Sequence, residues 1–439
     1  MPREVCDATM RILAVADEAS EGIGFQSKDP GHFESLYLAA STKSPARVGA
    51  KTLLPNVRET LCSLVPPSEA CVQPKSRTAQ VGCTLRSCSH HLALLPSQGV
   101  VTAHWGINVA PRQYSEHLNL LVVPFPYVLA ADAFEARDPR GRGGHYFGVR
   151  QSWLPRDPRT FVGFVDQLCD AAERTAARIH AMVFPEISLS PSIASIVADR
   201  LRKRGFEFFV AGVGPNAGRR SLPENIAEIH VGSDLSRQSK HHRWCLDNGQ
   251  IKRYQLAHVL DGSQIWWEDI ELRKREVNFL VFRHGATLAV LVCEDLARVD
   301  PAQVVLRSVG ANLVIALLFD GPQLENRWPG RYATVLAEDP GSSVLTVTSL
   351  GMARRAQSEP PSHHAGLEVA LWKEAGSSAT SLTLPPNHHA LLLSLALRKE
   401  ENWTLDGRSD GGTSYRVSLE QHEAIQIARP PAWARVGVF

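Results

Sequence analysis

Three side chains have types and positions suited to nucleophilic catalysis: a thiol, a carboxylate and an amine, spaced almost evenly at positions 293, 186 and 240. Cys293 ends an aliphatic, strand-like run, and Glu186 follows another apolar run after Pro185. Lys240 lies between them in the polar segment 239–242. A thiol reacts as the thiolate and therefore needs a base or a cation nearby. Because loops converge on substrate at the carboxyl ends of strands, these residues predict a nucleophile, a base and an electrophilic cation.

Two of these residues, Cys293 and Lys240, have competing interpretations. A free cysteine at the end of a buried strand is often a packing residue. Lys252, in the segment 250–254, is the main competitor of Lys240 for the lysine role. His241 and His242 are further candidates for bases or metal ligands, although a neutral pair beside a lysine more often positions it or is solvated.

At these motifs the chain resembles the carbon-nitrogen hydrolase, or nitrilase, superfamily. That family has an apolar strand ending in Pro-Glu, a Lys-x-His segment, and a strand ending in Cys followed closely by an acid. The matching residues here are Pro185-Glu186, Lys240-His241-His242 and Cys293-Glu294-Asp295. Lys240 fits the Lys-x-His form, and Lys252 does not. The similarity extends through residues 313–318, 331–339 and 344–348, and it covers the chain from Leu118 to about Leu405.

The resemblance implies roles for these residues. Glu186 would accept the proton of the Cys293 thiol, which attacks an amide or nitrile carbon to give a covalent thioester or thioimidate. Lys240 and the backbone N–H of Glu294 would stabilise the oxyanion. A charged lysine beside the thiol is also expected to favour the thiolate. Asp295 is expected to anchor the turn after the nucleophile.

A second glutamate between the lysine and the cysteine commonly orients the substrate or the lysine in this family. Glu268 is the candidate here, and Glu271 and Glu276 remain rivals for the same role. Trp266 and Trp267 beside Glu268 are either pocket walls or packing aromatics.

Departures from the family pattern leave the substrate open. Most members place an aromatic residue between the cysteine and the acid, whereas Cys293-Glu294-Asp295 is closer to the glutaminase module of glutamine-dependent NAD synthetase. No Ser-Gly-Gly-x-Asp-Ser loop follows, so a complete synthetase is excluded. Residues 293–298 and 328–332 are also similar to the nitrilase-like domains fused to some bacterial reverse transcriptases, although no Tyr-x-Asp-Asp polymerase motif occurs.

The predicted function is therefore hydrolysis of a non-peptide carbon-nitrogen bond by a Glu186-Lys240-Cys293 triad, with no cofactor and no metal. The alternative is a catalytically idle or regulatory nitrilase-like module in a defence or signalling assembly. A serine or zinc hydrolase has little support, because neither Gly-x-Ser-x-Gly nor His-Glu-x-x-His occurs. Gly212-Val213-Gly214 lacks the rest of a dinucleotide fingerprint.

Alternating strand-like and helix-like runs predict an α/β fold. Apolar residues at helical spacing over 161–179 lead into a strand at 181–184, and the helix-like segment 193–204 leads into a strand at 206–213. The resemblance implies an α-β-β-α sandwich of the nitrilase type over residues 117–439, usually doubled in a homodimer. Residues 1–116 are an N-terminal extension to which the sequence assigns no fold.

The composition restricts the expected partners and compartment. The 439 residues carry a net charge of +2, which does not indicate nucleic acid or an anionic membrane as partner. The apolar runs are far shorter than the roughly 20 residues that span a bilayer, and the N-terminus lacks a signal pattern. We therefore expect a cytoplasmic protein acting on a small amide or nitrile.

The eight cysteines are scattered along the chain and predict reduced thiols. Cys83, Cys88, His90 and His91 form a cluster that could hold zinc, but their spacing fits no two-plus-two ligand pattern well. Ordinary thiols and surface histidines are the favoured interpretation.

Overall fold

The structure is a computed structural model. It describes residues 4–5, 8, 70–72, 92–94, 101–107, 116–138, 143–214, 223–272, 275–283, 286–357, 366–401 and 413–436. The cysteine and histidine cluster at residues 83–91 lies outside these ranges.

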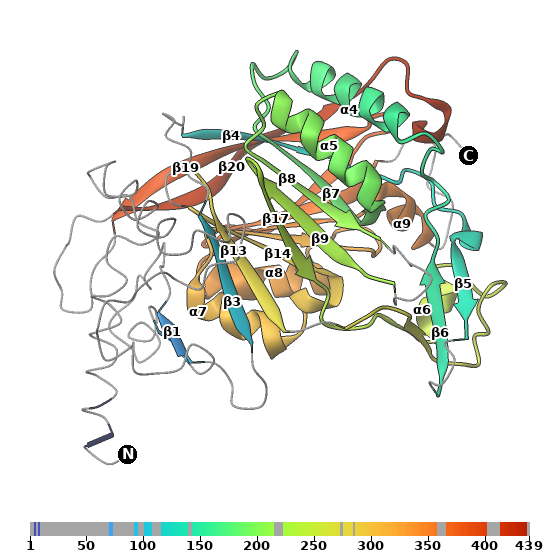
Figure 1. Cartoon of the computed structure of the whole chain (residues 1–439), viewed down its shortest axis with the longest axis horizontal. Coiled ribbons are helices and arrows are strands. Elements are labelled where there is room, and N and C mark those ends of the chain that lie inside the picture. The colour runs from blue at the N-terminus through green and yellow to red at the C-terminus, as the bar shows by residue number, and fades with distance from the viewer. Residues whose placement is uncertain are drawn as a thin grey trace.

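Within the described ranges, two sheets of seven strands each form the centre of the molecule (Figure 1). The first sheet has, in spatial order, β10 (Asp234–Ser239), β9 (Ile226–Val231), β8 (Phe208–Val213), β7 (Ala181–Leu189), β4 (His117–Val122), β19 (Ala390–Glu401) and β20 (Thr413–Ile425). The second has β18 (Thr380–Leu384), β17 (Leu367–Lys373), β16 (Ser343–Val347), β15 (Leu313–Leu317), β14 (Thr287–Val292), β13 (Glu276–Val281) and β3 (Thr102–Ile107).

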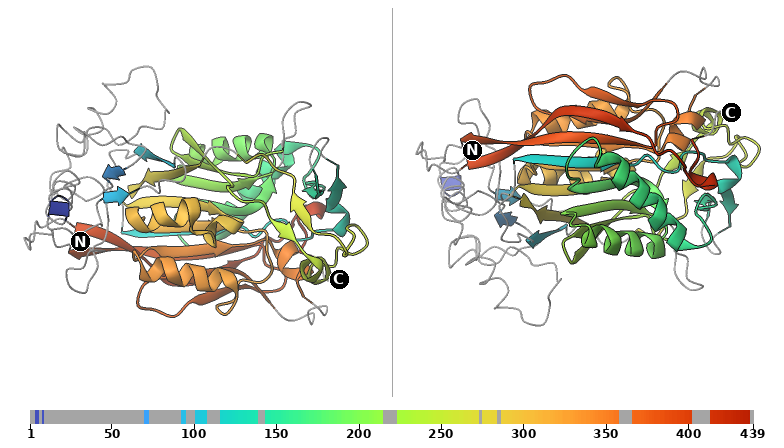
Figure 2. Two further views of the ribbon diagram at one scale, coloured as in Figure 1. Left: turned by 90° about the horizontal axis from the view of Figure 1, so that it is seen from below. Right: turned by 90° about the horizontal axis from the view of Figure 1, so that it is seen from above.

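Helices cover the outer faces of the two sheets, so the layers run α-β-β-α (Figure 2). On the first sheet lie α4 (Pro158–Ala172) and α5 (Pro191–Lys203), and on the second lie α7 (Val304–Val309) and α8 (Trp328–Glu338). α9 (Leu350–Arg355) follows β16. The fold class expected from the sequence is confirmed.

A smaller sheet lies at one end of the sandwich, where the candidate site residues are found. It consists of β11 (Cys245–Leu246), β12 (Trp266–Glu268), β6 (His145–Val149) and β5 (Phe134–Arg137), with α6 (Asn248–Arg253) between β11 and β12 in the chain. A separate pair, β1 (Ala70–Val72) and β2 (Leu92–Leu94), is antiparallel.

Local sequence explains the helices on either side of β7. Asp157 caps α4 by accepting the N–H of Arg159 at 3.0 Å, and Pro158 occupies the first turn. Ser190 caps α5 in the same way, so the helix begins at Pro191, two residues before the start expected from periodicity. Gly205 follows that helix with φ of +81°, a conformation that glycine adopts without strain. These capping residues fix where the two helices begin, and Gly205 marks the end of α5.

The central strands are buried along their whole length. Every residue of β7, β8, β14, β15 and β16 is buried. Parallel strands covered on both faces have this uniform pattern, which is why they appear in the sequence as continuous aliphatic runs.

The boundary expected at residue 116 stays a prediction. β3 lies ahead of that position and pairs in parallel with β13, at the edge of the second sheet. No helix in the described part of the chain combines the length and apolar character required to cross a membrane.

Candidate active site

Glu186 lies inside β7, where this strand departs from regular pairing. The register with β8 shifts between Phe184 and Leu189, and Ile187 has φ of +54°. Ser188 Oγ donates to the carbonyl of Pro185 at 2.6 Å. The strand therefore bulges at the glutamate, which turns a carboxylate into the space between the sheets.

Lys240 follows the last residue of β10 and is 1% exposed. Its ammonium donates to Glu186 Oε1 at 2.9 Å and to Glu268 Oε2 at 2.7 Å. One buried amine thus lies between two buried carboxylates, one from β7 and the other from β12.

Asn225, just before β9, completes this cluster. Its Nδ2 donates to Glu186 Oε1 at 2.7 Å and to Glu268 Oε1 at 2.8 Å. The backbone N–H of Trp244 adds a third donor to Glu268, at 3.0 Å from Oε2. Both oxygens of Glu268 are therefore occupied, whereas Glu186 Oε2 is buried and has no partner among the described residues.

Cys293 directly follows β14 and is 4% exposed. Its φ of +47° is in the left-handed region, which costs a residue with a side chain about 1–3 kcal/mol and is found where a reactive group must be held at a sharp turn. The backbone N–H of Phe319, beyond β15, forms a hydrogen bond with the thiol.

Burial and the charges of the cluster shift the pKa of the Cys293 thiol. Burial raises the pKa of the Cys293 thiol well above its ordinary value, Glu186 raises it further, and Lys240 lowers it without reversing the shift. The lysine acts in the expected direction, but burial and the carboxylate outweigh it.

The acid and the amine of the cluster are shifted as well. Burial raises the pKa of Glu186, and the charge of Glu268 raises it further, while Lys240 opposes both. The pKa of Lys240 lies well above its ordinary value: burial acts to lower it, but the charges of Glu186, Glu268 and Cys293 outweigh burial. The amine therefore stays charged across the ordinary pH range.

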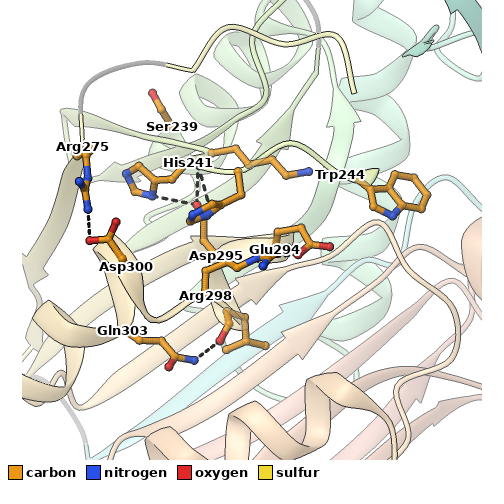
Figure 3. Close-up of polar contacts among 12 residues, drawn as sticks. Ser239, His241, Trp244, Arg275, Glu294, Asp295, Arg298, Asp300 and Gln303 are labelled. Carbon is orange, nitrogen blue, oxygen red and sulfur yellow. Dashed lines mark hydrogen bonds and ion pairs between the residues drawn. The ribbon is translucent and has the colours of Figure 1, made fainter. Parts of the chain in front are cut away.

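Asp295 joins the turn after Cys293 to the segment that carries Lys240 (Figure 3). It accepts the backbone N–H of His241 at 3.0 Å, contacts the ring Nδ1 of His241 at 3.1 Å, and contacts Nδ1 of His242 at 2.9 Å. Burial opposes ionisation of Asp295, but the two histidines hold its pKa below the ordinary value. His241 Nε2 lies 3.1 Å from the carbonyl of Glu276, so both its ring nitrogens face acceptors.

The rival candidates lie elsewhere. Lys252 is exposed on α6. Glu271 and Glu276 are half-buried. The carboxylates to which Lys240 donates are those of Glu186 and Glu268. Glu268 occupies the position that an accessory glutamate requires, although its role stays a prediction.

Glu294 follows Cys293 in the sequence, and Trp266 and Trp267 precede Glu268. Glu294 places its carboxylate 3.4 Å from Arg298. Trp266 and Glu268 are buried on one face of β12, and Trp267, 42% exposed, points to the other. Trp267 is therefore no wall of this site.

Sequence reasoning missed two residues that shape the site. Asn225 stands in a loop without a recognisable motif, so no signal identified it. Gly212 was considered only as part of a dinucleotide fingerprint. A Cβ at Gly212 would lie 2.3 Å from the Pro185 carbonyl oxygen and 2.4 Å from Glu186 Cα, so only glycine lets β8 approach the bulge.

Comparison with known proteins gives similarities of fold only. No family model and no curated protein matches the sequence. The structure is similar to an amidase of the nitrilase superfamily from Nesterenkonia sp. AN1, solved with the acetamide moiety of fluoroacetamide covalently added at the active site cysteine. That match has 13% identity and a TM-score of 0.34, and it covers 71% of this chain and 91% of the amidase.

Two further solved structures have similar scores. Saccharomyces cerevisiae Nit3, of branch 10 of the nitrilase superfamily, has 13% identity and a TM-score of 0.34, over 62% of this chain and 91% of Nit3. Glutamine-dependent NAD+ synthetase from Acinetobacter baumannii has 13% identity and a TM-score of 0.38, over 71% of this chain. The match spans about half, 49%, of the synthetase. At TM-scores below 0.5, these similarities carry no argument about activity.

Proposed function

We propose that this chain hydrolyses a non-peptide carbon-nitrogen bond, in an amide or a nitrile, through a covalent intermediate on Cys293. The observation that supports this most strongly is the position of Lys240 Nζ, which lies 2.9 Å from Glu186 and 2.7 Å from Glu268. The negative charge of a Cys293 thiolate also raises the pKa of Lys240. A buried ammonium, a carboxylate with an unpartnered oxygen and a thiol at a sharp turn are the groups that two-step nucleophilic hydrolysis requires.

On an amide, Glu186 takes the proton from Cys293 Sγ as the sulfur bonds to the carbonyl carbon. Lys240 and the backbone N–H of Glu294 stabilise the oxyanion that forms. The carbon-nitrogen bond then breaks, and Glu186 gives its proton to the leaving ammonia, so that a thioester remains. Water, deprotonated by Glu186, attacks the thioester, the carbon-sulfur bond breaks, and the proton returns to the thiol. On a nitrile, the same attack gives a thioimidate, whose conversion to the acid consumes one more water.

Ammonia release from a panel of small amides and nitriles tests this proposal. We expect Cys293→Ala to abolish release from the substrate that the wild type accepts. We expect Lys240→Met to lower kcat/KM by about 10²–10³-fold, the usual effect of removing an oxyanion donor. The matched control is Lys252→Met, which removes an exposed lysine on α6 and should leave kcat/KM unchanged. Release that survives in Cys293→Ala would show that the proposal is wrong.

One observation favours a second candidate function, an idle or regulatory module in a larger assembly. Cys293 is almost fully covered, and burial raises its pKa, so the unliganded chain presents little reactive thiolate. Iodoacetamide labelling and ammonia release together separate the two functions. Because the thiol is covered and its pKa is raised, Cys293 should be labelled slowly in either case. A hydrolase should show protection of Cys293 by a substrate and release ammonia from that substrate, whereas an idle module should show neither. The similarity to domains fused to reverse transcriptases stays a prediction.

We also propose that the chain acts in the cytoplasm as a homodimer, as the resemblance implies. The first sheet ends in β20, a long edge strand of 13 residues paired only with β19 among the described strands. Light scattering should give twice the mass of the 48.2 kDa chain. A monomer at micromolar concentration would contradict this part of the proposal.

A further inference from the structure

Asp320 is a buried carboxylate that the proposed mechanism does not use. It lies three residues beyond β15, the neighbour of the strand that carries Cys293, and it is 5% exposed. Its backbone is fixed to the end of β16: Thr348 Oγ1 donates to the Asp320 carbonyl at 2.6 Å and accepts the Asp320 N–H at 3.3 Å. These two hydrogen bonds fix the position of the Asp320 backbone, from which the side chain extends.

Only one oxygen of this carboxylate is occupied by the protein. The hydroxyl of Tyr254 donates to Oδ1 at 2.5 Å, and Arg327 Nη2 donates to the same atom at 3.0 Å. Oδ2 is buried and has no hydrogen-bond partner among the described residues. A buried carboxylate oxygen without a hydrogen-bond donor lowers the stability of the fold. Asp320 Oδ2 is therefore an acceptor available to a donor from another molecule.

One hydrogen bond and one electrostatic interaction connect this acceptor with the nucleophile. Phe319, the residue before Asp320, donates its backbone N–H to the Cys293 thiol. Burial raises the pKa of the Tyr254 phenol, Asp320 adds to the shift, and the charge of a Cys293 thiolate raises it further. The residue before Asp320 and the phenol bound to its Oδ1 thus both interact with the sulfur.

We propose that Asp320 Oδ2 binds a hydrogen-bond donor on the substrate, a few atoms from the carbon that Cys293 attacks. The inference rests on the proposed hydrolase function and narrows its substrate class. Because Arg327 already balances the charge of Asp320, the fitting donor is a neutral group, such as a hydroxyl or a second carboxamide, and not an ammonium. The substrate is then a small amide or nitrile whose far end carries an N–H or O–H.

The test uses the full chain and matched neutral amides that protect Cys293 from iodoacetamide, followed by mass spectrometry. Succinamide and levulinamide have similar shapes, but only succinamide has a donor at its far end. γ-Hydroxybutyramide and valeramide form a second pair. In the wild type, we expect the donor-bearing member to protect at a concentration about tenfold lower than its partner, because the partner leaves Oδ2 unpaired.

In Asp320→Asn, the preference should disappear. Tyr254 and Arg327 are both donors, so they select the amide oxygen for the Oδ1 position and leave an N–H where Oδ2 was. The matched control is Glu325→Gln, which removes an exposed carboxylate from the same segment and should keep the wild-type preference.

The outcomes separate this inference from the proposed function. Equal protection by both members of each pair in the wild type, or a preference that persists in Asp320→Asn, would overturn the subsite alone. If no amide protects Cys293 and none releases ammonia, the hydrolase proposal falls and the subsite with it. The wild-type comparison needs no variant, so it decides even if Asp320→Asn does not fold.

Discussion

At Cys293 and its neighbours, two carboxylates share one ammonium. Lys240 lies between Glu186 and Glu268, and the charges of Lys240 and Glu186 act on the thiol of Cys293. Because burial penalises every charged form, the resting site keeps the thiol proton on sulfur. Proton transfer from Cys293 to Glu186 then accompanies attack on the substrate, because the positive charge of Lys240 stabilises the oxyanion that develops in that step.

This arrangement predicts an unusual acid limb in the pH profile of kcat/KM. Glu186 must be ionised to accept a proton, and burial raises its pKa, so activity should fall as the pH drops through a value above the ordinary glutamate pKa of about 4.3. Lys240, whose pKa is raised, should cause no alkaline loss below about pH 10. Steady-state rates across the pH range measure both limbs.

Glu268→Gln provides the check on the cause of that limb. The charge of Glu268 is one of the influences that raise the pKa of Glu186, so the acid limb should move to lower pH in whatever activity this variant retains. A limb at the ordinary glutamate pKa in the wild type, or one that Glu268→Gln leaves in place, would contradict the assignment of Glu186 as the base.

Among the elements, the bulge of β7 is what brings Glu186 to the site. A regular strand would alternate its side chains between the two faces, and residues 185–188 would pair with β8 in register. The register shift and the left-handed Ile187 instead turn the glutamate inward. β8 can follow this bulge only because Gly212 has no side chain at the point of closest approach.

We therefore expect Gly212→Ala to be destabilising. The new Cβ would meet backbone atoms of Pro185 and Glu186 at less than 2.5 Å, and backbone cannot move aside cheaply. The free energy of unfolding in urea should fall by about 1–3 kcal/mol or more, with loss of activity through displacement of Glu186. Gly163→Ala, in α4 with no atom within 4 Å of its new Cβ, should instead stabilise by about 0.5–1 kcal/mol. Equal effects of the two substitutions would show that the close approach is unimportant.

Sequence patterns predicted the elements better than the contacts between them. The aliphatic runs before Cys293 and Glu186 are strands because parallel strands buried on both faces need uniformly apolar residues. Lys240 and Glu268 were singled out through the motif order of a resembling family. Asn225 could not be predicted, since a single bridging amide in a loop belongs to no motif and to no periodic pattern in the sequence. The thiol pKa depends on burial, which local sequence does not reveal.

Asp295 connects elements from different sheets. Lys240 follows an edge strand of the first sheet and Cys293 a central strand of the second, and Asp295 binds His241 and His242 across that gap. The carboxylate thereby sets the spacing between the amine and the sulfur. A shift of about 1 Å in such a spacing can cost roughly 10²-fold in rate.

Asp295→Asn should consequently lower both stability and activity. Losing the charge-assisted bonds should reduce the free energy of unfolding by about 1–3 kcal/mol at neutral pH. The fold depresses the pKa of Asp295, so this contribution is present above the unfolded value of about 3.9 and is lost as the pH falls through the lower folded value. Urea unfolding of the wild type and the variant should then converge only below about pH 4.

The control for this substitution lies five residues further along the chain, in the next helical turn. Asp300 is exposed and pairs with Arg275 (Figure 3). Asp300→Asn should change the free energy of unfolding by no more than about 1 kcal/mol and leave the rate unchanged. A wild-type rate in Asp295→Asn would show that its histidine contacts are only structural.

In the whole molecule, the two sheets are tied together at both ends. Asp295 makes one tie at the carboxyl ends of β7 and β14. Arg283, 2% exposed and beyond β13, makes the other: its guanidinium pairs with Glu207, just before β8, and donates to the carbonyl of His117 at 2.6 Å. These residues lie at the edge of the sandwich where β7 and β14 begin, so the second tie is separated from the site by the length of the strands.

Arg283→Met should separate stability from chemistry. Removing one partner of a buried ion pair leaves Glu207 unpaired, so the free energy of unfolding should fall by about 3–5 kcal/mol. Arg202→Met breaks an exposed pair with Asp199 and should cost no more than about 1 kcal/mol. Below the unfolding transition, the acid limb of kcat/KM and the iodoacetamide rate of Cys293 should match the wild type in both variants, because the site end keeps its own tie. Altered thiol reactivity in folded Arg283→Met would mean that the spacing of the sheets at the site is set by the whole sandwich and not by Asp295.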